Sequence, residues 1–184
     1  MLDPLTRRLA ARLKELRTEK GWSLDQLAEA SGVSRATLSR LEKAEVSPTT
    51  EVLGKLCVAY SMSLTRLLAA IEEQFTAHIP AKAQSLFEDK GKGFARRAIS
   101  PPAASLKGEV LECDLAPGSF ISYEAPPVSG QEHHLVLLDG ELDLRIGETD
   151  YHLSAGDCLR YQLYEPSEFR SDPEKGARYL LVLI

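Results

Sequence analysis

Apolar residues in the first seventy positions recur at three- and four-residue steps, which is the period of an amphipathic α-helix. In residues 4–21 this stripe consists of Leu5, Leu9, Leu13 and Leu16, and Arg and Lys occupy the other face. Four further segments of this kind follow residues that cap helix N-termini: Ser23, Ser34, Thr49 or Thr50, and Ser63. The pattern predicts five short helices between residues 4 and 70.

After about residue 85 the period becomes that of β-strands. The apolar stretches, separated by Gly and Pro turns, read FARRAIS, EVLECDL, HHLVLLDGELDLRIG, DYHLSAGDCLRYQ and ARYLLVLI. Leu142, Leu144 and Ile146 alternate with charged residues, and Asp139-Gly140 is a favoured two-residue turn, so we expect a hairpin there. About six to ten strands in roughly 100 residues without helices predict a sandwich or a barrel.

The segment between these two patterns, residues 72–85, has no sustained period and contains Pro80. We interpret it as a linker that is helical in part. The predicted organisation is therefore α+β with two domains, a helical domain at residues 1–71 and a β domain at residues 86–184.

Composition narrows the class of protein. Hydrophobic residues make up 43% of the 184 residues and charged residues 27%, which is typical of a globular protein. The sequence shows neither an apolar run long enough to span a membrane nor a charged-then-apolar leader, so we expect a cytoplasmic protein without a membrane partner. The three cysteines are far apart and form no CxxC pair, so we expect reduced thiols rather than disulfides or a zinc site.

The net charge of −5 is distributed unevenly. Residues 1–71 contain 11 Lys and Arg against 8 Asp and Glu, a balance of +3, whereas residues 72–184 contain 11 against 19, a balance of −8. This asymmetry indicates an anionic partner for the helical domain only.

A tight turn joins the second and third predicted helices. Gly32 allows positive φ at the corner, and Val33 fills the space between the two helices. The stretch from Leu24 to Glu42 fits LxxLAxxxGVSxxxLSxLE and resembles the five-helix, phage-repressor-like DNA-binding domain of the XRE family. The resemblance covers residues 5–71 and implies that the third helix lies in the major groove of double-stranded DNA.

The exposed side of that third helix carries the candidate DNA contacts. Arg35 and Arg40 are the candidate base readers, because a guanidinium can pair bidentately with guanine. Ser39 is a second candidate reader, Ala36 lies on the same face, and Ser34, Thr37 and Lys43 are placed for phosphate contacts. Backbone N–H groups at Ser23 and Thr49 are expected to be free for phosphate at the starts of the second and fourth helices.

The β domain, residues 86–184, resembles a cupin, a small jelly-roll barrel, with Gly140, Gly156 and Asp157 at the expected turns. Metal-binding cupins supply two His and a Glu from a first motif and a His from a second. In this sequence His133 stands at the Glu position, Pro127 and Ser129 (or Pro126 and Val128) at the first-motif His positions, and Ser167 at the second-motif His position, with Ser171 replacing a neighbouring Asn. We therefore expect no bound metal and no cofactor, since one imidazole does not hold a divalent ion tightly.

Neighbouring strand residues point to opposite faces, so Glu132 and His134 lie opposite His133 and do not share one ion with it. A barrel of this size can still hold a small ligand. The candidate ligand-binding residues are Tyr123, Glu124, His133, Arg160, Tyr161 and Ser167, with Tyr164 and Glu168 as further candidates for the lining.

The two resemblances together imply a transcriptional regulator that binds a pseudo-palindromic DNA operator as a homodimer and senses a small metabolite in its cupin domain. The sequence shows no arrangement of catalytic residues, and we expect no enzyme activity. Two alternatives stay open: a metal-dependent cupin enzyme, an oxygenase or isomerase, that carries an autoregulatory DNA-binding domain, and an interaction module whose side-chain-filled barrel binds protein.

Overall fold

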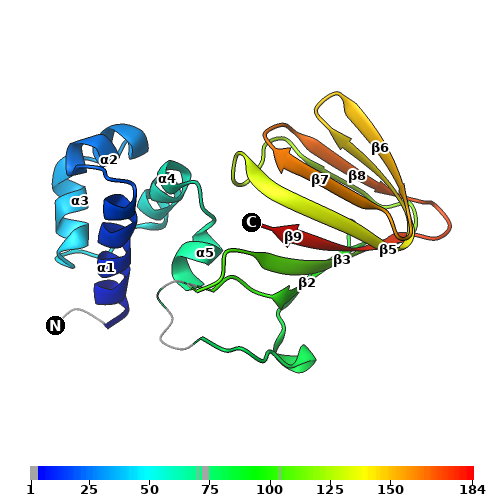
Figure 1. Ribbon diagram of the computed structural model, residues 1–184, viewed down its shortest axis with the longest axis horizontal. Coiled ribbons are helices and arrows are strands. Elements are labelled where there is room, and N and C mark those ends of the chain that lie inside the picture. The colour runs from blue at the N-terminus through cyan, green and yellow to red at the C-terminus, as the bar shows by residue number, and fades with distance from the viewer. Residues whose placement is uncertain (1–3, 70, 72–74, 104) are drawn as a thin grey trace. The chain divides into compact units, whose positions relative to one another are not determined.

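The computed structural model describes residues 4–69, 71, 75–103 and 105–184, which form two compact units (Figure 1). The described part of the first unit runs to Phe75 and includes Ala103 and Ser105, and the second unit begins at Thr76. The predicted order of helices followed by strands is confirmed, because every strand among the described residues begins after residue 85. The second unit starts inside the predicted linker, and the exact domain limits stay a prediction.

The first unit contains the five predicted helices. They are α1 (Pro4–Glu19), α2 (Leu24–Ser31), α3 (Arg35–Glu42), α4 (Thr50–Tyr60) and α5 (Leu64–Ala69). Ser23, Ser34 and Thr49 cap the second, third and fourth helices, since each side chain accepts a hydrogen bond from the backbone N–H three residues later. The local sequence signals thus place the helix starts correctly.

Leucines from every helix form the core of this unit. Leu27, Leu38, Leu56 and Leu67 are almost fully buried, and the buried stripe of α1 runs from Leu9 to Leu16. The expectation that Leu5 is part of this stripe is wrong, because it is 47% exposed: it lies in the first turn of α1, one turn before the stripe begins.

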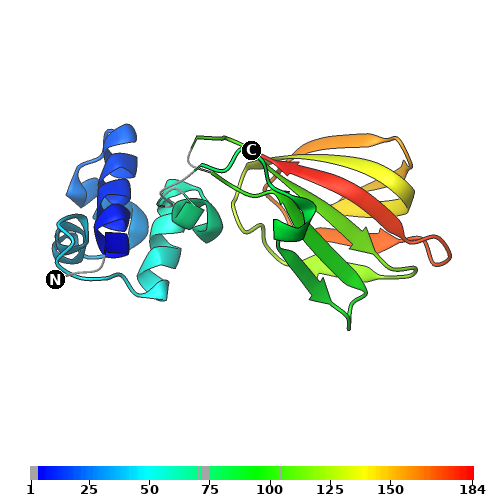
Figure 2. The ribbon, with the colours of Figure 1, turned by 90° about the horizontal axis from the view of Figure 1, so that it is seen from below.

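The second unit is a nine-stranded antiparallel sheet preceded by a short 3-10 helix, η1 (Ala81–Ala83), within the predicted linker. The strands are β1 (Leu86–Asp89), β2 (Phe94–Ser100), β3 (Glu109–Leu115), β4 (Phe120–Tyr123), β5 (Gln131–Ile146), β6 (Thr149–Ser154), β7 (Cys158–Leu163), β8 (Ser167–Ser171) and β9 (Ala177–Leu183). Their order is β1-β2-β3-β9-β5-β8-β4, with β6 and β7 also paired to β5. The sheet curls so that one face turns inward, as Figures 1 and 2 show, and this half-barrel confirms the cupin-like architecture.

The long strand β5 connects the two halves of this sheet. Its first part pairs with β7 and its last part with β6 and β8, while β9 runs along it from His133 to Gly140. Leu135, Leu137, Leu142 and Leu144 point inward from β5 and are at most 1% exposed. One strand therefore supplies much of the barrel core.

The hairpin predicted at Asp139-Gly140 is wrong. The chain continues through Gly140 as part of β5, with a bulge in its pairing to β9 between Leu137 and Asp139. Gly140 has φ +80°, and an added Cβ would meet the carbonyl oxygen of Gly176, so close backbone approach rather than a turn explains this glycine. The turn itself comes later, at Gly147 and Glu148, between the paired residues Ile146 and Thr149.

None of the helices in the described ranges is sufficiently long and apolar to cross a membrane.

Candidate nucleic-acid interface and barrel cavity

The turn between α2 and α3 fixes the angle of the candidate recognition helix. Gly32 ends α2 in the left-handed conformation, at φ 66°, and its N–H donates to the carbonyl of Ala28. Val33 is 6% exposed and packs into the core, as its position in the sequence predicts. The Ser34 hydroxyl accepts the N–H of Thr37 at 3.1 Å and so starts α3 immediately after the turn.

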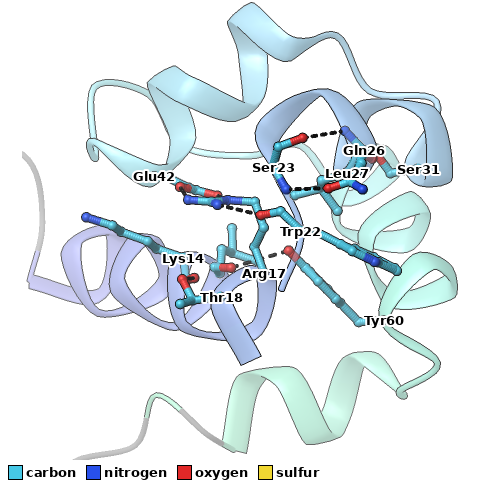
Figure 3. Close-up of polar contacts among 11 residues, drawn as sticks. Lys14, Arg17, Thr18, Trp22, Ser23, Gln26, Leu27, Ser31, Glu42 and Tyr60 are labelled. Carbon is cyan, nitrogen blue, oxygen red and sulfur yellow. Dashed lines mark hydrogen bonds and ion pairs between the residues drawn. The ribbon is translucent and has the colours of Figure 1, made fainter. Parts of the chain in front are cut away.

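A half-buried ion pair joins α1 to α3 below this turn (Figure 3). Arg17 Nε and Nη2 donate to the two carboxylate oxygens of Glu42 at 2.7 and 2.8 Å, and Nη1 donates to the carbonyl of Trp22 at 2.7 Å. The pKa of Arg17 is raised, first by the hydrogen bond to Glu42, so the pair stays charged. The Arg17 side chain of α1 therefore links α1 both to α3 and to the segment that precedes α2.

The exposed face of α3 carries the residues predicted to contact DNA. Ser34, Arg35, Ala36, Arg40 and Lys43 are exposed, and Thr37 and Ser39 are partly buried. The opposite face buries Leu38 and Leu41, each 2% exposed, in the core of the helical unit. The structure therefore brings these predicted residues together on one continuous, cationic surface.

Both candidate base readers are placed beside carboxylates that the sequence analysis missed. Arg35 Nε lies 3.1 Å from Asp25 Oδ1 on α2, and Arg40 Nε lies 3.9 Å from Glu45 Oε2 just after α3. Both pairs are mostly exposed, so water and salt screen them and they are readily exchanged for other anions. No local signal reveals the Arg35 pair, because Asp25 reaches it only through the packing of α2 against α3.

The expectation of a free backbone N–H at Ser23 is wrong. That N–H donates to the side chain of Gln26 at 2.8 Å, while the Gln26 N–H donates to the Ser23 hydroxyl, a reciprocal capping box (Figure 3). The Thr49 hydroxyl likewise caps α4 by accepting the Val52 N–H at 3.3 Å. Both residues are exposed at helix starts, as predicted, but the Ser23 amide already has a partner.

The inner face of the curled sheet contains a cavity of about 110 Å³. Its lining comes from β2, β3, β4, β5, β7, β8, β9 and the loop before β5: Phe94, Arg96, Leu111, Cys113, Tyr123, Pro127, Gln131, His133, Leu163, Ser167, Phe169, Tyr179, Leu181 and Leu183. The walls are mostly apolar, with a few hydroxyl, imidazole and guanidinium groups, a composition typical of small-molecule sites.

His133 is the buried imidazole of this cavity. It is 7% exposed, and its Nδ1 lies 3.2 Å from the Tyr161 hydroxyl on β7. Burial lowers the pKa of His133 to about 4, so the ring is neutral at pH 7. His134 points away from the cavity and its Nε2 lies 2.7 Å from Glu132 Oε1, which confirms the predicted separation of His133 from its two neighbours.

The structure brings together only part of the predicted ligand-binding set. Tyr123, His133 and Ser167 line the cavity, and Tyr161 contacts His133. The prediction that Glu124 and Arg160 lie there is wrong: Glu124 is exposed in the loop after β4, and Arg160 is exposed at an outward position of β7. Tyr164 is 61% exposed, and Glu168 lines a different hollow.

The sequence analysis missed most of the lining, including four polar residues. Arg96, Cys113, Gln131 and Tyr179 line the cavity from β2, β3, β5 and β9. Strand alternation carries a signal for Arg96, because it shares a face with Phe94 and Ala98, both of which pack toward the barrel core. The charge of Arg96 made an outward position the default expectation for that side chain.

Comparison with known proteins agrees with both halves of the chain. The Helix-turn-helix family model matches residues 13–67. The transcriptional regulator SutR of Escherichia coli is 28% identical over 178 residues, which cover 97% of this chain and 95% of SutR. The uncharacterized HTH-type transcriptional regulator YgzD of Bacillus subtilis is 36% identical over 62 residues, covering 34% of this chain and 94% of YgzD. The chain belongs to the helix-turn-helix transcriptional regulators.

Solved structures show the fold of this regulator. An HTH_3 family transcriptional regulator from Vibrio cholerae is 23% identical and covers 98% of both chains, with a TM-score of 0.52. Hydroxypropylphosphonic acid epoxidase from S. wedmorenis is 15% identical and covers 97% of both chains, with a TM-score of 0.53. Because one fold is shared by a regulator and an enzyme, the chemistry of the regulator's cavity has to be judged from its own residues.

The regulator's cavity does not fit a divalent metal of the kind that cupins bind. Among the candidate ligand positions His133 offers one ring nitrogen, Ser167 a neutral hydroxyl and Pro127 nothing. Burial raises the pKa of the Cys113 thiol to about 11, so it is protonated and a poor ligand. Within the described ranges no three His, Cys, Asp or Glu side chains lie close enough to hold an ion together.

A larger hollow of about 410 Å³ lies on the outer face of the regulator's sheet, lined from β4, β5, β6 and β8. Its polar groups are paired with each other: Arg145 binds Asp150 at 2.6 Å, and His152 Nδ1 lies 2.7 Å from Asp143. These side chains are more than half exposed, so water already solvates them. Size alone therefore does not make this hollow the ligand site, and the mostly apolar cavity on the inner face is the better candidate.

Proposed function

We propose that this regulator binds a two-fold symmetric DNA operator as a homodimer and that a small molecule in the barrel cavity changes its affinity for that operator. The observation that carries the DNA-binding part is the surface of α3. Arg35, Arg40 and Lys43 are exposed there, and only side chains on the far side of the helix are buried. Arg35 and Arg40 read base edges, and Ser34, Thr37 and Lys43 hold phosphates.

A single recognition helix reads only a few base pairs, so useful specificity needs two half-sites about 34–36 Å apart. The outer face of the barrel supplies a surface for pairing two chains. Outward positions of the adjacent strands β3, β9 and β5 place Val110 opposite Val182, and Leu180 opposite Val136. An antiparallel sheet with one solvated face normally carries polar residues at such positions. The apolar row formed by these four residues is bordered by His134, opposite Val182, and by Glu112, opposite Leu180. It favours a partner, and the proposed partner is a second copy of this chain.

The cavity supports the sensing part of the proposal. It lies on the inner face of the sheet, it contains a neutral imidazole and several hydroxyl groups, and its described residues lack the ligand set of a metal enzyme. Effector and operator affinities are then reciprocally coupled, since any effector that changes DNA affinity has its own affinity changed by DNA to the same extent.

Selection of bound duplexes from a random pool by the full-length protein tests the DNA-binding part, at one stated salt concentration. The expected result is enrichment of a two-fold symmetric motif. Enrichment of a single asymmetric site would contradict the dimer, and no enrichment would contradict operator recognition by the unliganded protein. Equal affinity for the selected operator with and without an established cavity ligand would contradict sensing.

Because the fold is similar to that of an epoxidase, the alternative function is an enzyme with an autoregulatory DNA-binding domain. We propose that the chain is not such an enzyme, because its cavity presents one imidazole and neutral hydroxyls where a metal would need several donors. Elemental analysis of the purified protein separates the two, since stoichiometric iron, manganese or nickel would support the enzyme. The remaining alternative, a barrel filled by its own side chains, is disfavoured by the cavity itself.

A further inference from the structure

Among the described residues that line the barrel cavity, Arg96 is the charged one, and it is exposed, so it stands at the solvent-facing edge of the cavity. It lies on β2 directly opposite Cys113 on β3, on the inward face that also carries Phe94. The neighbouring Arg97 faces outward, where its Nε lies 3.9 Å from Glu112 Oε2. Both arginines are accessible to solvent, and of the two only Arg96 borders the cavity.

The Arg96 guanidinium has no carboxylate at ion-pair distance among the residues that the structure describes; it lies over the Phe87 ring, 5.8 Å from the centroid. The cavity lining contains no Asp, Glu or Lys. Glu109, on the same face of β3, lies beyond Leu111 and outside the lining. The cavity therefore has one positive charge that no acidic group of its lining neutralises.

The other polar groups of the lining are neutral. Burial keeps His133 uncharged and raises the pKa of both Tyr123 and Tyr179, so their hydroxyls stay protonated and can donate hydrogen bonds. Ser167, at 2% exposure, offers a further hydroxyl. One guanidinium with several neutral donors suits one negative charge, because a dianion would bury a second charge without a counter-charge.

The size of the cavity and its apolar walls define the uncharged part of the ligand. A cavity of about 110 Å³ is equivalent to about four water molecules at roughly 30 Å³ each. Leu111, Leu163, Leu181, Leu183 and Phe169 form apolar walls. A ligand with a short hydrocarbon body and one anionic end fills this space, and a planar carboxylate pairs with a guanidinium through two parallel hydrogen bonds.

We propose that the barrel cavity binds a small monocarboxylate with an apolar body of a few carbons, its carboxylate on Arg96 and its body against the leucine and phenylalanine wall. This inference deepens the proposed sensing function. Its regulatory consequence rests on that proposed function, but binding of the carboxylate can be measured without DNA.

Isothermal titration calorimetry on the full chain tests the site with propionate, butyrate, isobutyrate and valerate. Butyramide, which has nearly the same shape as butyrate and no charge, is the matched neutral probe. Arg96→Gln removes the charge, and Arg97→Gln is the matched control on the outer face of the same strand. Circular dichroism of each variant shows that the fold is retained, and Arg96→Lys provides a second variant that keeps the charge and loses the planar fork.

The expected result is that at least one of these carboxylates binds and butyramide does not bind measurably. Arg96→Gln is expected to weaken binding by at least about tenfold, as for loss of a charge-assisted hydrogen bond, while Arg97→Gln leaves it unchanged and Arg96→Lys is intermediate. Three results would overturn the proposal: no binding by any carboxylate, equal binding of butyrate and butyramide, or equal loss in Arg96→Gln and Arg97→Gln. Carboxylate binding without any effect on operator affinity would instead contradict sensing and leave the site in place.

Discussion

Arg17 and Glu42 carry more of the helical unit's stability than other ion pairs on its surface. Their side chains are only 17% and 8% exposed, and Arg17 also binds the Trp22 carbonyl. Arg17→Met leaves Glu42 charged and half-enclosed without its counter-charge. We expect the free energy of unfolding to fall by about 3 kcal/mol, measured by urea denaturation of the full chain followed by circular dichroism.

Lys55→Met is the matched control for this change. Lys55 pairs with Glu51 on α4 at 2.7 Å, but both side chains are largely exposed, so its loss is expected to leave the unfolding midpoint unchanged within error. Equal destabilisation by the two variants would show that the Arg17–Glu42 pair has no special role.

His133 gives the stability of the protein a dependence on pH. Its pKa is about 4 in the folded protein, against 6.5 for an unperturbed histidine, and the cause is burial. As pH falls below 6.5 the unfolded state binds a proton that the folded state excludes, so stability is lost between pH 6.5 and about 4. His133→Asn is expected to reduce this loss, with a slope smaller by up to about 1.4 kcal/mol per pH unit.

His152→Gln is the control with the opposite sign. The hydrogen bond to Asp143 raises the pKa of His152, so its contribution is present at low pH and is lost as pH rises through the raised pKa. Denaturation series from pH 4 to 7.5 on the three proteins measure both effects. A pH slope for His133→Asn identical to that of the wild type would mean that the buried imidazole is not neutral.

The element that we propose to contact DNA is α3. Arg35→Ala and Arg40→Ala are each expected to cost about 1–3 kcal/mol and to relax base preference at one position of each half-site. Lys43→Ala is expected to weaken all duplexes alike and to make the salt slope shallower by about one unit. Binding titrations at several salt concentrations measure these effects, and an Arg40→Ala variant with unchanged affinity and base preference would place the recognition surface elsewhere.

Helices were easier to predict from the sequence than the path of the long strand. Each helix start after α1 has a local signal, a Ser or Thr whose side chain caps the following turn, and the structure places Ser23, Ser34 and Thr49 in that role. Gly140 has a local signal that misleads: Asp139-Gly140 is turn-like, yet the glycine serves the close approach of Gly176, a residue far along the chain. Tertiary neighbours decide such positions, and they are invisible to a local pattern.

The two candidate sites differ in the same way: local sequence signals predict the face of α3, whereas the cavity depends on tertiary neighbours. The exposed face of α3 follows from helical periodicity alone, because buried Leu38 and Leu41 fix which side faces out. The cavity needed the sheet order: alternation places Arg96 on an inward face, but only the β2–β3 pairing brings it beside Cys113, and only the curl of the sheet brings both near His133. Arg160 was a candidate for the lining and lies outside by the same alternation.

For the molecule as a whole, the apolar row on the outside of the barrel predicts how two chains associate. Leu180→Glu introduces a charge into this row, between Val136 on β5 and Glu112 on β3, and circular dichroism checks that the barrel still folds with the two carboxylates side by side. We expect the variant to sediment as a monomer at concentrations where the wild type is a dimer, and to lose affinity for a symmetric operator. Thr149→Glu, at the exposed start of β6, is the control. A monomeric wild type, or a dimeric Leu180→Glu variant, would contradict this interface.

Strand β5 also bears on how the β unit opens. Its first part is hydrogen-bonded to β7 and its last part to β6 and β8, with β9 along residues 133–140, so both halves of the sheet depend on one continuous strand of sixteen residues. The amide protons of β5 are therefore expected to exchange with deuterium only through global unfolding of the barrel, while those of the edge strand β1 exchange through local fraying. A ligand that contacts His133, near the start of β5, would then slow amide exchange at the far end of the strand, near Ile146, as much as near His133 itself.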